Sequence, residues 1–105
     1  EIVVMDLDGI RHKTDRNYVG CFVGDHVKFA INTRIMTGSM IGMGAMIATS
    51  TPAPAPTPRF AWLTDGGSRT YRISKFLDVA RTVMARRDKE LDAATEAVIQ
   101  RLAGS

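Results

Sequence analysis

An apolar residue recurs at every sixth position through the centre of the chain, and this spacing constrains the fold more than any other feature. A period of six matches neither the two-residue alternation of a strand nor the roughly 3.6-residue repeat of a helix. It is typical of a parallel β-helix, in which each six-residue side lays down one short strand and then turns a corner. The apolar positions are Val23, Phe29, Ile35, Ile41 and Ile47. Small residues directly follow four of them, Gly24, Ala30, Gly42 and Ala48, with Met36 the one departure. Small residues also stand two places before four of them, at Val27, Thr33, Ser39 and Ala45.

Three sides complete one winding of such a helix, so residues eighteen apart are predicted to lie one above the other. Val23 should lie under Ile41, and Phe29 under Ile47. The hexads run over residues 18–49 and fill only about two windings. Because each winding is stabilised by its neighbours, we expect further windings, partner subunits, or both to cover the open end.

The segments that flank the repeats complete one domain. Residues 1–17 are predicted to form a β-ribbon that turns at Asp8-Gly9, a dipeptide that tolerates the positive φ of a tight hairpin. Residues 50–70 form a proline-rich strap and loop, which we expect to end the repeats abruptly because proline cannot donate to a strand ladder. Phe60 and Trp62 are interpreted as docking this strap onto the repeats rather than binding a base or a sugar.

Residues 71–105 change to a helical pattern and are predicted to form a helical hairpin that caps one end. Ser74 is the expected N-cap of the first helix, and Arg86 and Arg87 suit its C-terminal end. The second helix is expected to begin after Asp92. The apolar faces are formed by Phe76, Leu77, Ala80, Val83 and Met84 and by Ala94, Ala97, Val98, Ile99 and Leu102.

Composition indicates a cytoplasmic chain. The formal net charge is +3, which suits phosphate-bearing ligands but is too small for a nucleic-acid-binding tail. The single cysteine, Cys21, excludes an internal disulfide and falls in a column of small residues, so a packed core thiol is expected. No apolar run is long enough to span a membrane.

The chain enters an apolar run directly from Glu1, and we expect it to be a fragment of a longer protein.

Particular motifs, together with the hexads, resemble a known family. They are Val-Gly-Asp-His over residues 23–26, Ile-Asn-Thr over 31–33, Thr37-Gly38 before Ile41-Gly42, the proline-rich exit and a helix that ends Val-Met-Ala-Arg-Arg. This order resembles the C-terminal domain of sugar-1-phosphate nucleotidyltransferases, similar to the bifunctional N-acetylglucosamine-1-phosphate uridyltransferase and glucosamine-1-phosphate acetyltransferase. The resemblance implies a mainly β fold, a short left-handed parallel β-helix with an N-terminal ribbon and a C-terminal helical cap.

The resemblance also implies a function. The chain would be the trimer-forming domain of a transferase that makes a sugar nucleotide, and nucleotidyl transfer would be carried by an N-terminal domain that binds a nucleoside triphosphate with Mg²⁺. No glycine-rich phosphate loop is present, because Gly42 and Gly44 lie inside the hexads. Hence we expect no cofactor and no metal in this chain, a homotrimer as its assembly, and neither nucleic acid nor membrane as a partner.

An alternative is an acyltransferase-like activity that uses acetyl-CoA on an amino sugar phosphate in a groove between subunits. His26 is then the candidate catalytic base, and Arg16, Asn17 and Tyr18 are the candidate substrate-binding residues. Two departures count against this alternative. Tyr18 stands where related acetyltransferases have a lysine, and Ile31 where they have a serine.

Three further hypotheses remain open from the residues alone. Arg11, His12, Lys13 and Arg16 form a basic cluster that either meets a phosphate or is a solvated ribbon edge. Asp6 and Asp8 are interpreted as parts of a turn rather than of a calcium loop. A stand-alone scaffold protein is the third reading of the whole chain.

Overall fold

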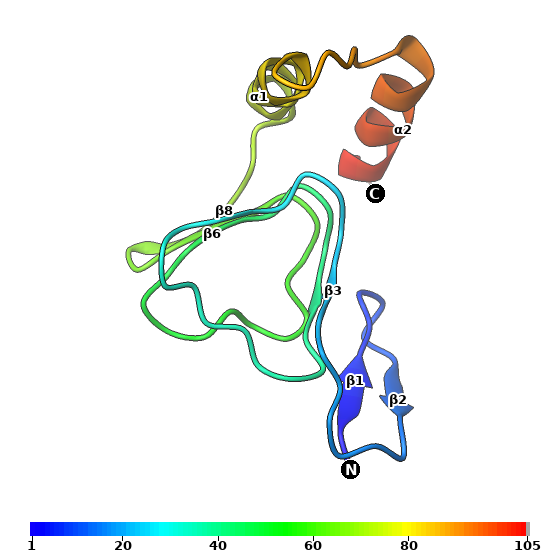
Figure 1. Cartoon of the computed structure of the whole chain (residues 1–105), viewed down its shortest axis with the longest axis vertical. Coiled ribbons are helices and arrows are strands. Elements are labelled where there is room, and N and C mark those ends of the chain that lie inside the picture. Colours follow the sequence, from blue (N-terminus) through cyan, green and yellow to red (C-terminus); the bar gives the residue numbers. More distant parts are fainter. Residues whose placement is uncertain (105) are drawn as a thin grey trace.

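The computed structural model describes residues 1–104, which form eight short strands and two helices. Figure 1 shows the backbone of the central residues winding in three-sided turns, with the N-terminal ribbon at one corner and both helices beyond another. The elements are β1 (Val3–Met5), β2 (Arg11–Lys13), β3 (Phe22–Val23), β4 (Lys28–Phe29), β5 (Met40–Ile41), β6 (Met46–Ala48), β7 (Ala61–Thr64), β8 (Gly67–Thr70), α1 (Ile73–Ala85) and α2 (Ala93–Ala103).

The N-terminal ribbon forms as predicted. Strands β1 and β2 pair antiparallel, and Gly9 takes a φ of 82° in the turn between them. Val4 is buried at the centre of β1. The ribbon contacts the central windings near Gly38, where an added Cβ would lie 2.7 Å from a side-chain methyl of Ile2.

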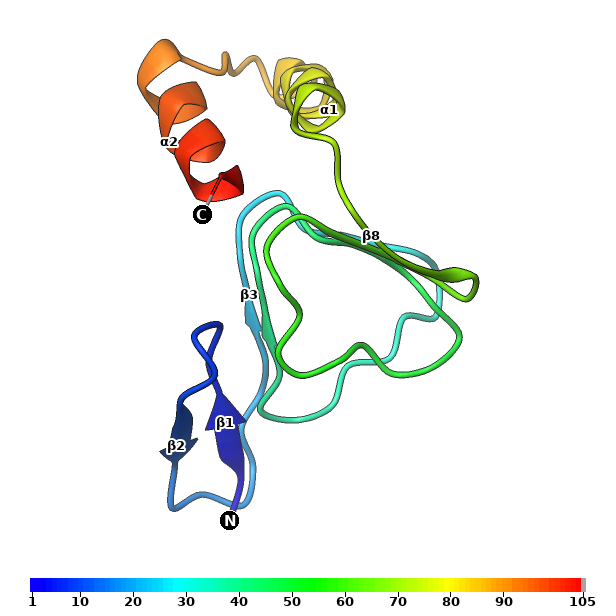
Figure 2. The ribbon, with the colours of Figure 1, turned by 180° about the vertical axis from the view of Figure 1, so that it is seen from behind.

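The predicted stacking of residues eighteen apart is confirmed on two sides of the windings. Strand β3 pairs in parallel with β5, so that Val23 lies opposite Ile41. Strand β4 pairs in parallel with β6, so that Phe29 lies opposite Ile47. We call residues 18–36 the first winding and residues 37–54 the second winding. Figure 1 looks onto the first winding and Figure 2 onto the opposite end.

The prediction that the proline-rich segment ends the parallel stacking is wrong. Thr57 forms a parallel bridge with Ile41, and β7 pairs in parallel with β6, Trp62 lying opposite Met46. Residues 55–64 therefore form a third winding that lies sixteen rather than eighteen residues after the second. The prolines, at positions 52, 54, 56 and 58, fall where the backbone makes no strand, which is why they interrupt the ladder without ending the stack.

The expected fold class, a mainly β left-handed parallel β-helix, is also wrong. The chain is a small mixed α/β structure whose strands lie in separate antiparallel, parallel and mixed sheets, and no β-helical solenoid is found in residues 1–104. Strands form on only two sides of each winding and are two to four residues long. The helices, of 13 and 11 residues, hold as much of the chain as all the strands together.

Two apolar clusters hold these elements together. The first lies inside the windings and consists of Ile41, Ala45, Ile47, Ala53, Ala61 and Leu63. The second joins the windings to the helices and consists of Phe60, Tyr71, Phe76, Leu77, Ala80 and Ile99. Cys21 belongs to neither, and the prediction of a packed core thiol is wrong because its side chain is exposed in the first winding.

Phe60 lies against Gly44 of the second winding and packs on Phe76 of α1, and Trp62 packs on Tyr71, which leads into α1. Phe60 is buried, and its ring meets Phe76 edge-on at 5.1 Å between centroids. The Trp62 ring packs on Tyr71 at 4.8 Å. The two aromatic residues therefore dock the first helix onto the third winding.

The two helices differ in how they begin. Helix α1 starts two residues earlier than predicted, with Arg72 and not Ser74 at the N-cap, and no side chain caps it. Helix α2 begins as predicted after Asp92, whose carboxylate accepts a hydrogen bond from the Thr95 backbone N–H at 2.7 Å. This bond is the main reason that the pKa of Asp92 lies below its usual range.

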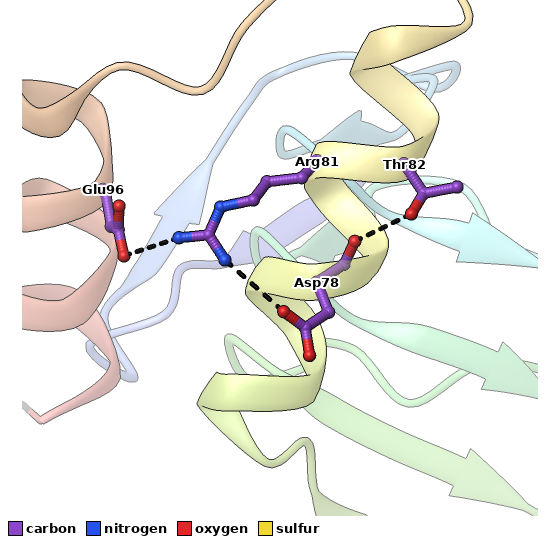
Figure 3. Close-up of polar contacts among 4 residues, drawn as sticks. All are labelled: Asp78, Arg81, Thr82 and Glu96. Atoms are coloured by element: carbon purple, nitrogen blue, oxygen red, sulfur yellow. Dashed lines mark hydrogen bonds and ion pairs between the residues drawn. The ribbon is translucent and has the colours of Figure 1, made fainter.

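One ion pair connects the helices. Arg81 of α1 reaches Glu96 of α2 at 2.8 Å and also contacts Asp78 on its own helix, as Figure 3 shows. Because Arg81 is about half exposed, this pair contributes little to stability, and the contact of the helices depends mainly on buried Ile99 and Leu77. Within residues 1–104, neither helix is long and apolar enough to cross a membrane.

Candidate functional site

His26, the candidate catalytic base, lies at a corner of the first winding with a φ of 61°. Its ring meets Phe76 of α1 edge-on, at 5.6 Å between centroids. Neither a hydrogen bond nor an ion pair joins it to Asp25 among the described residues. The neighbouring carboxylate therefore does not orient the imidazole, and the contact with Phe76 gives His26 a packing role between the winding and the helix.

The candidate substrate-binding residues, Arg16, Asn17 and Tyr18, lie in the exposed segment between the ribbon and the first winding. The carbonyl of Arg16 accepts a hydrogen bond from the Ile2 backbone N–H, which ties this segment to the start of the ribbon. In Figure 1 it lies near the N-terminus, whereas the corner with His26 faces the helices. The structure therefore does not bring these residues together with His26 within one subunit.

A His-Asp pair that the sequence did not suggest lies in the ribbon. His12 Nε2 is 2.7 Å from Asp6 Oδ2, and Asp6 Oδ1 accepts hydrogen bonds from the backbone N–H groups of Asp8 and Ile10. The hydrogen bond from His12, followed by those from the backbone, lowers the pKa of Asp6 from its ordinary value. The observed register of β1 and β2 places Asp6 diagonally across from His12, and the predicted turn at Asp8-Gly9 alone did not fix this register.

The basic cluster of the ribbon does not converge on one point. Arg11, His12 and Lys13 are consecutive in strand β2, so the side chain of His12 lies on the opposite face from the other two. All three are exposed. In residues 1–104 no group of three or more His, Cys, Asp or Glu side chains is placed to hold a metal ion.

Several large apolar side chains of the first winding are exposed. Val23 is 46% exposed, whereas Ile41, its partner one winding on, is 1% exposed. Phe29 is 41% exposed, whereas its partner Ile47 is fully buried. We call the whole set the first-winding apolar surface; it consists of Tyr18, Phe22, Val23, Phe29, Ile31 and Met36.

The first winding also exposes backbone groups. Its N–H groups at Phe22, Gly24, Lys28 and Ala30 donate to the second winding, so one edge of β3 and β4 is satisfied. The sheet order places both strands at edges, so their other edges carry unpaired N–H and C=O groups. An exposed strand edge beside apolar side chains is typical of a protein interface rather than of a catalytic pocket.

Comparison with known proteins identifies no relative. No protein-family model, no curated protein and no solved structure matches the chain.

Proposed function

We propose that this chain is the trimer-forming assembly module of a protein related to sugar-1-phosphate nucleotidyltransferases, and that another domain of that protein carries out nucleotidyl transfer. The family part of the proposal rests on the motifs of residues 23–42 and the order of the segments that follow them. The assembly part rests on one observation, the first-winding apolar surface.

The size of that surface supports burial in an assembly. Ile31 is 93% exposed and Tyr18 is 92% exposed, which is unusual for large side chains of a chain that remains alone in water. Fully burying an aliphatic or aromatic side chain contributes roughly 1.5–3 kcal/mol. Burial of four or five such side chains per subunit therefore supplies several kcal/mol towards association.

The distribution of the surface favours a closed ring over a side-by-side two-fold dimer. Phe22 lies on β3 and Ile31 lies two residues after the end of β4, and these strands belong to different sheets on different sides of the winding. A side-by-side two-fold contact through one of these sides would leave the other in water. A ring uses two different surfaces of every subunit, and three copies are the smallest ring that does so.

Catalysis in this chain is not part of the proposal. His26 packs against Phe76, and within residues 1–104 no hydrogen bond or ion pair to its ring is found. The His12 and Asp6 pair lies on an exposed ribbon. The sugar phosphate and the nucleoside triphosphate, with its Mg²⁺, are proposed to bind elsewhere in the parent protein.

The test is the mass of the chain in solution, measured by sedimentation equilibrium at micromolar concentration. We expect three times the 11.5 kDa of one chain. A folded monomer at this concentration contradicts the proposal.

Paired variants locate the contact. Replacing Ile31 by Ser should shift the trimer towards monomer because it places a hydroxyl at an apolar interface. Ile10→Ser is the matched control, since Ile10 is also exposed, at 57%, but lies in the ribbon outside the first-winding apolar surface. Equal effects of the two changes would refute the location.

A further inference from the structure

Strand β8 forms a free edge at the end of the molecule opposite to the first winding. The four-stranded sheet has the order β4-β6-β7-β8, so β8 has a partner on one side only, and all four of its residues are exposed. In Figure 2 the hairpin of β7 and β8 lies in front of the windings formed earlier in the chain. A free strand edge is a template for an additional strand.

The register shows which backbone groups are available on this edge. Trp62 lies opposite Arg69, and two residues further on the Tyr71 N–H donates to the Phe60 carbonyl. These are the hydrogen-bonded pairs of the hairpin. Residues between them point their backbone groups the other way. The N–H and C=O groups of Ser68 and Thr70 therefore face outward.

A groove of about 700 Å³ runs along this edge. Its lining includes every residue from Gly66 to Arg72, together with Trp62, Thr64 and Lys75. Because Ser68 and Thr70 lie on one face of β8 and Arg69 on the other, a groove lined by all three follows the edge of the strand rather than one face of the sheet.

The groove is basic. Arg69, Arg72 and Lys75 line it, and within residues 1–104 none of these three side chains takes part in an ion pair. No acidic residue is part of the lining, and the nearby Asp65 carboxylate is held by the Ser50 N–H at 2.8 Å and the Ser50 hydroxyl at 3.0 Å. The first turn of α1, which carries Lys75, contains no acidic residue.

Two aromatic rings provide an apolar wall. Trp62 is 37% exposed and packs on buried Tyr71. Burial raises the pKa of Tyr71, so its phenol adds no negative charge to the groove. The indole lies directly across the ladder from Arg69, so an acidic group and an apolar group presented side by side would each meet a complementary partner.

We propose that the β8 edge binds an extended acidic peptide segment of a partner protein, which adds to the sheet as a fifth strand. The peptide backbone pairs with Ser68 and Thr70. Its carboxylates meet Arg69, Arg72 and Lys75, and one of its apolar side chains packs on Trp62. Backbone pairing supplies affinity and the charges supply selectivity, as in other complexes formed by strand addition.

The test uses the fluorescence of Trp62, which is the single tryptophan of the chain. The probe is a capped peptide of about eight residues that contains Glu, Thr and one central Val, a length that covers the four residues of β8 with a margin at each end. Its two controls are the same peptide with Gln in place of Glu and the same peptide N-methylated at alternate residues. We expect saturable binding of the Glu peptide and at least about tenfold weaker binding of each control.

Matched protein variants separate backbone pairing from charge. Thr70→Pro removes the outward N–H at a position where an edge strand tolerates proline, and it should weaken binding about tenfold. Ser68→Pro is the second variant if Thr70→Pro does not fold. Arg69→Ala should weaken binding about tenfold, whereas Arg86→Ala, an exposed cation outside the groove, should leave it unchanged.

Three results overturn the proposal. The first is equal binding of the Glu and Gln peptides, and the second is equal binding of the methylated and unmethylated peptides. The third is tighter binding of a single-stranded oligonucleotide that Thr70→Pro does not affect. The inference is independent of the proposed trimer, because the sedimentation mass should be the same for Thr70→Pro and the parent chain.

Discussion

Replacing Gly42 by Ala tests whether the third winding is packed as closely on the second as the structure shows. Gly42 is buried immediately after β5. A Cβ at this position would lie 2.6 Å from the Arg59 N, 2.8 Å from the Arg59 Cα and 2.9 Å from the Pro58 carbonyl carbon. All three are backbone atoms of the third winding, so no side-chain rotation can relieve the contact.

The cost follows from the shift that the added carbon requires. Unstrained carbon contacts lie at about 3.5–4.0 Å, so the third winding must move by about 0.9 Å. Two hydrogen bonds flank the contact, from the Gly42 N–H to the Thr57 carbonyl and from the Phe60 N–H to the Met43 carbonyl, each 2.9 Å long. Losing both costs about 2 kcal/mol, and overpacking adds about 1–3 kcal/mol. The expected destabilisation, about 3–5 kcal/mol, is a large part of the roughly 5–15 kcal/mol that keeps a domain folded.

Thermal unfolding followed by circular dichroism measures this effect. At about 4–8 °C per kcal/mol, Gly42→Ala should lower the melting temperature by at least about 12 °C. Gly20→Ala is the matched control because no atom lies within 4 Å of its added Cβ, and it should change the melting temperature by only a few degrees. Both variants are compared with the parent chain at one protein concentration. A Gly42→Ala melting temperature within about 4 °C of the parent value would refute the close contact.

Three further predictions concern single side chains. Ser39→Ala should leave the free energy of unfolding unchanged or raise it by up to about 1 kcal/mol, because the Ser39 hydroxyl is buried without a hydrogen-bond partner in the described chain. A chemical denaturation curve shifted to lower denaturant concentration contradicts this prediction. Ile47→Ala should cost about 2–5 kcal/mol, measured in the same way, because Ile47 is fully buried in the cluster inside the windings; a cost below about 1 kcal/mol would show that this cluster is loosely packed. Asp6→Asn should destabilise the chain at neutral pH by weakening the contact with His12. The folded pKa of Asp6 lies below the ordinary value of 3.8, so the stability that its carboxylate contributes is present above pH 3.8 and is lost as the pH falls through the folded pKa. The difference in melting temperature between Asp6→Asn and the parent should therefore shrink below pH 3.8, and a difference that grows there contradicts the prediction.

Local patterns predicted local structure well. The Asp8-Gly9 turn and the antiparallel ribbon follow from a dipeptide that accepts positive φ, and Asp92 caps α2 because a carboxylate at that place satisfies a free N–H. The six-residue spacing predicted the pairing of Val23 with Ile41 and of Phe29 with Ile47. Each of these predictions depends on residues close in sequence or on a strict repeat.

The errors arose where one segment's structure depends on another segment. The proline-rich residues break a strand locally, but Thr57 and β7 still stack because the apolar side chains of Ala53, Ala61 and Leu63 complete the cluster inside the windings. Cys21 lies one winding before Ser39, and Ser39 is fully buried. Cys21 is nevertheless exposed because the first winding has no neighbour on its other side.

The candidate sites show the same limit. His26 and Asp25 are neighbours in sequence, but the ring packs on Phe76, fifty residues later, because α1 closes over that corner. The basic groove combines Trp62 of β7 with Lys75 of α1, and no pattern in the sequence marks Arg69, Arg72 and Lys75 as one surface.

The sequence by itself determined the six-residue spacing of the windings, the turn of the ribbon and the N-cap of α2, since these depend on backbone preferences and on spacing along the chain. Only the tertiary structure decided how many windings stack, which strand edges stay open and which charges share a groove. The physical reason is that the burial of a side chain and the pairing of a strand edge each depend on a second segment of the chain. The same apolar column is buried at Ile41 and exposed at Val23, according to whether another winding covers it.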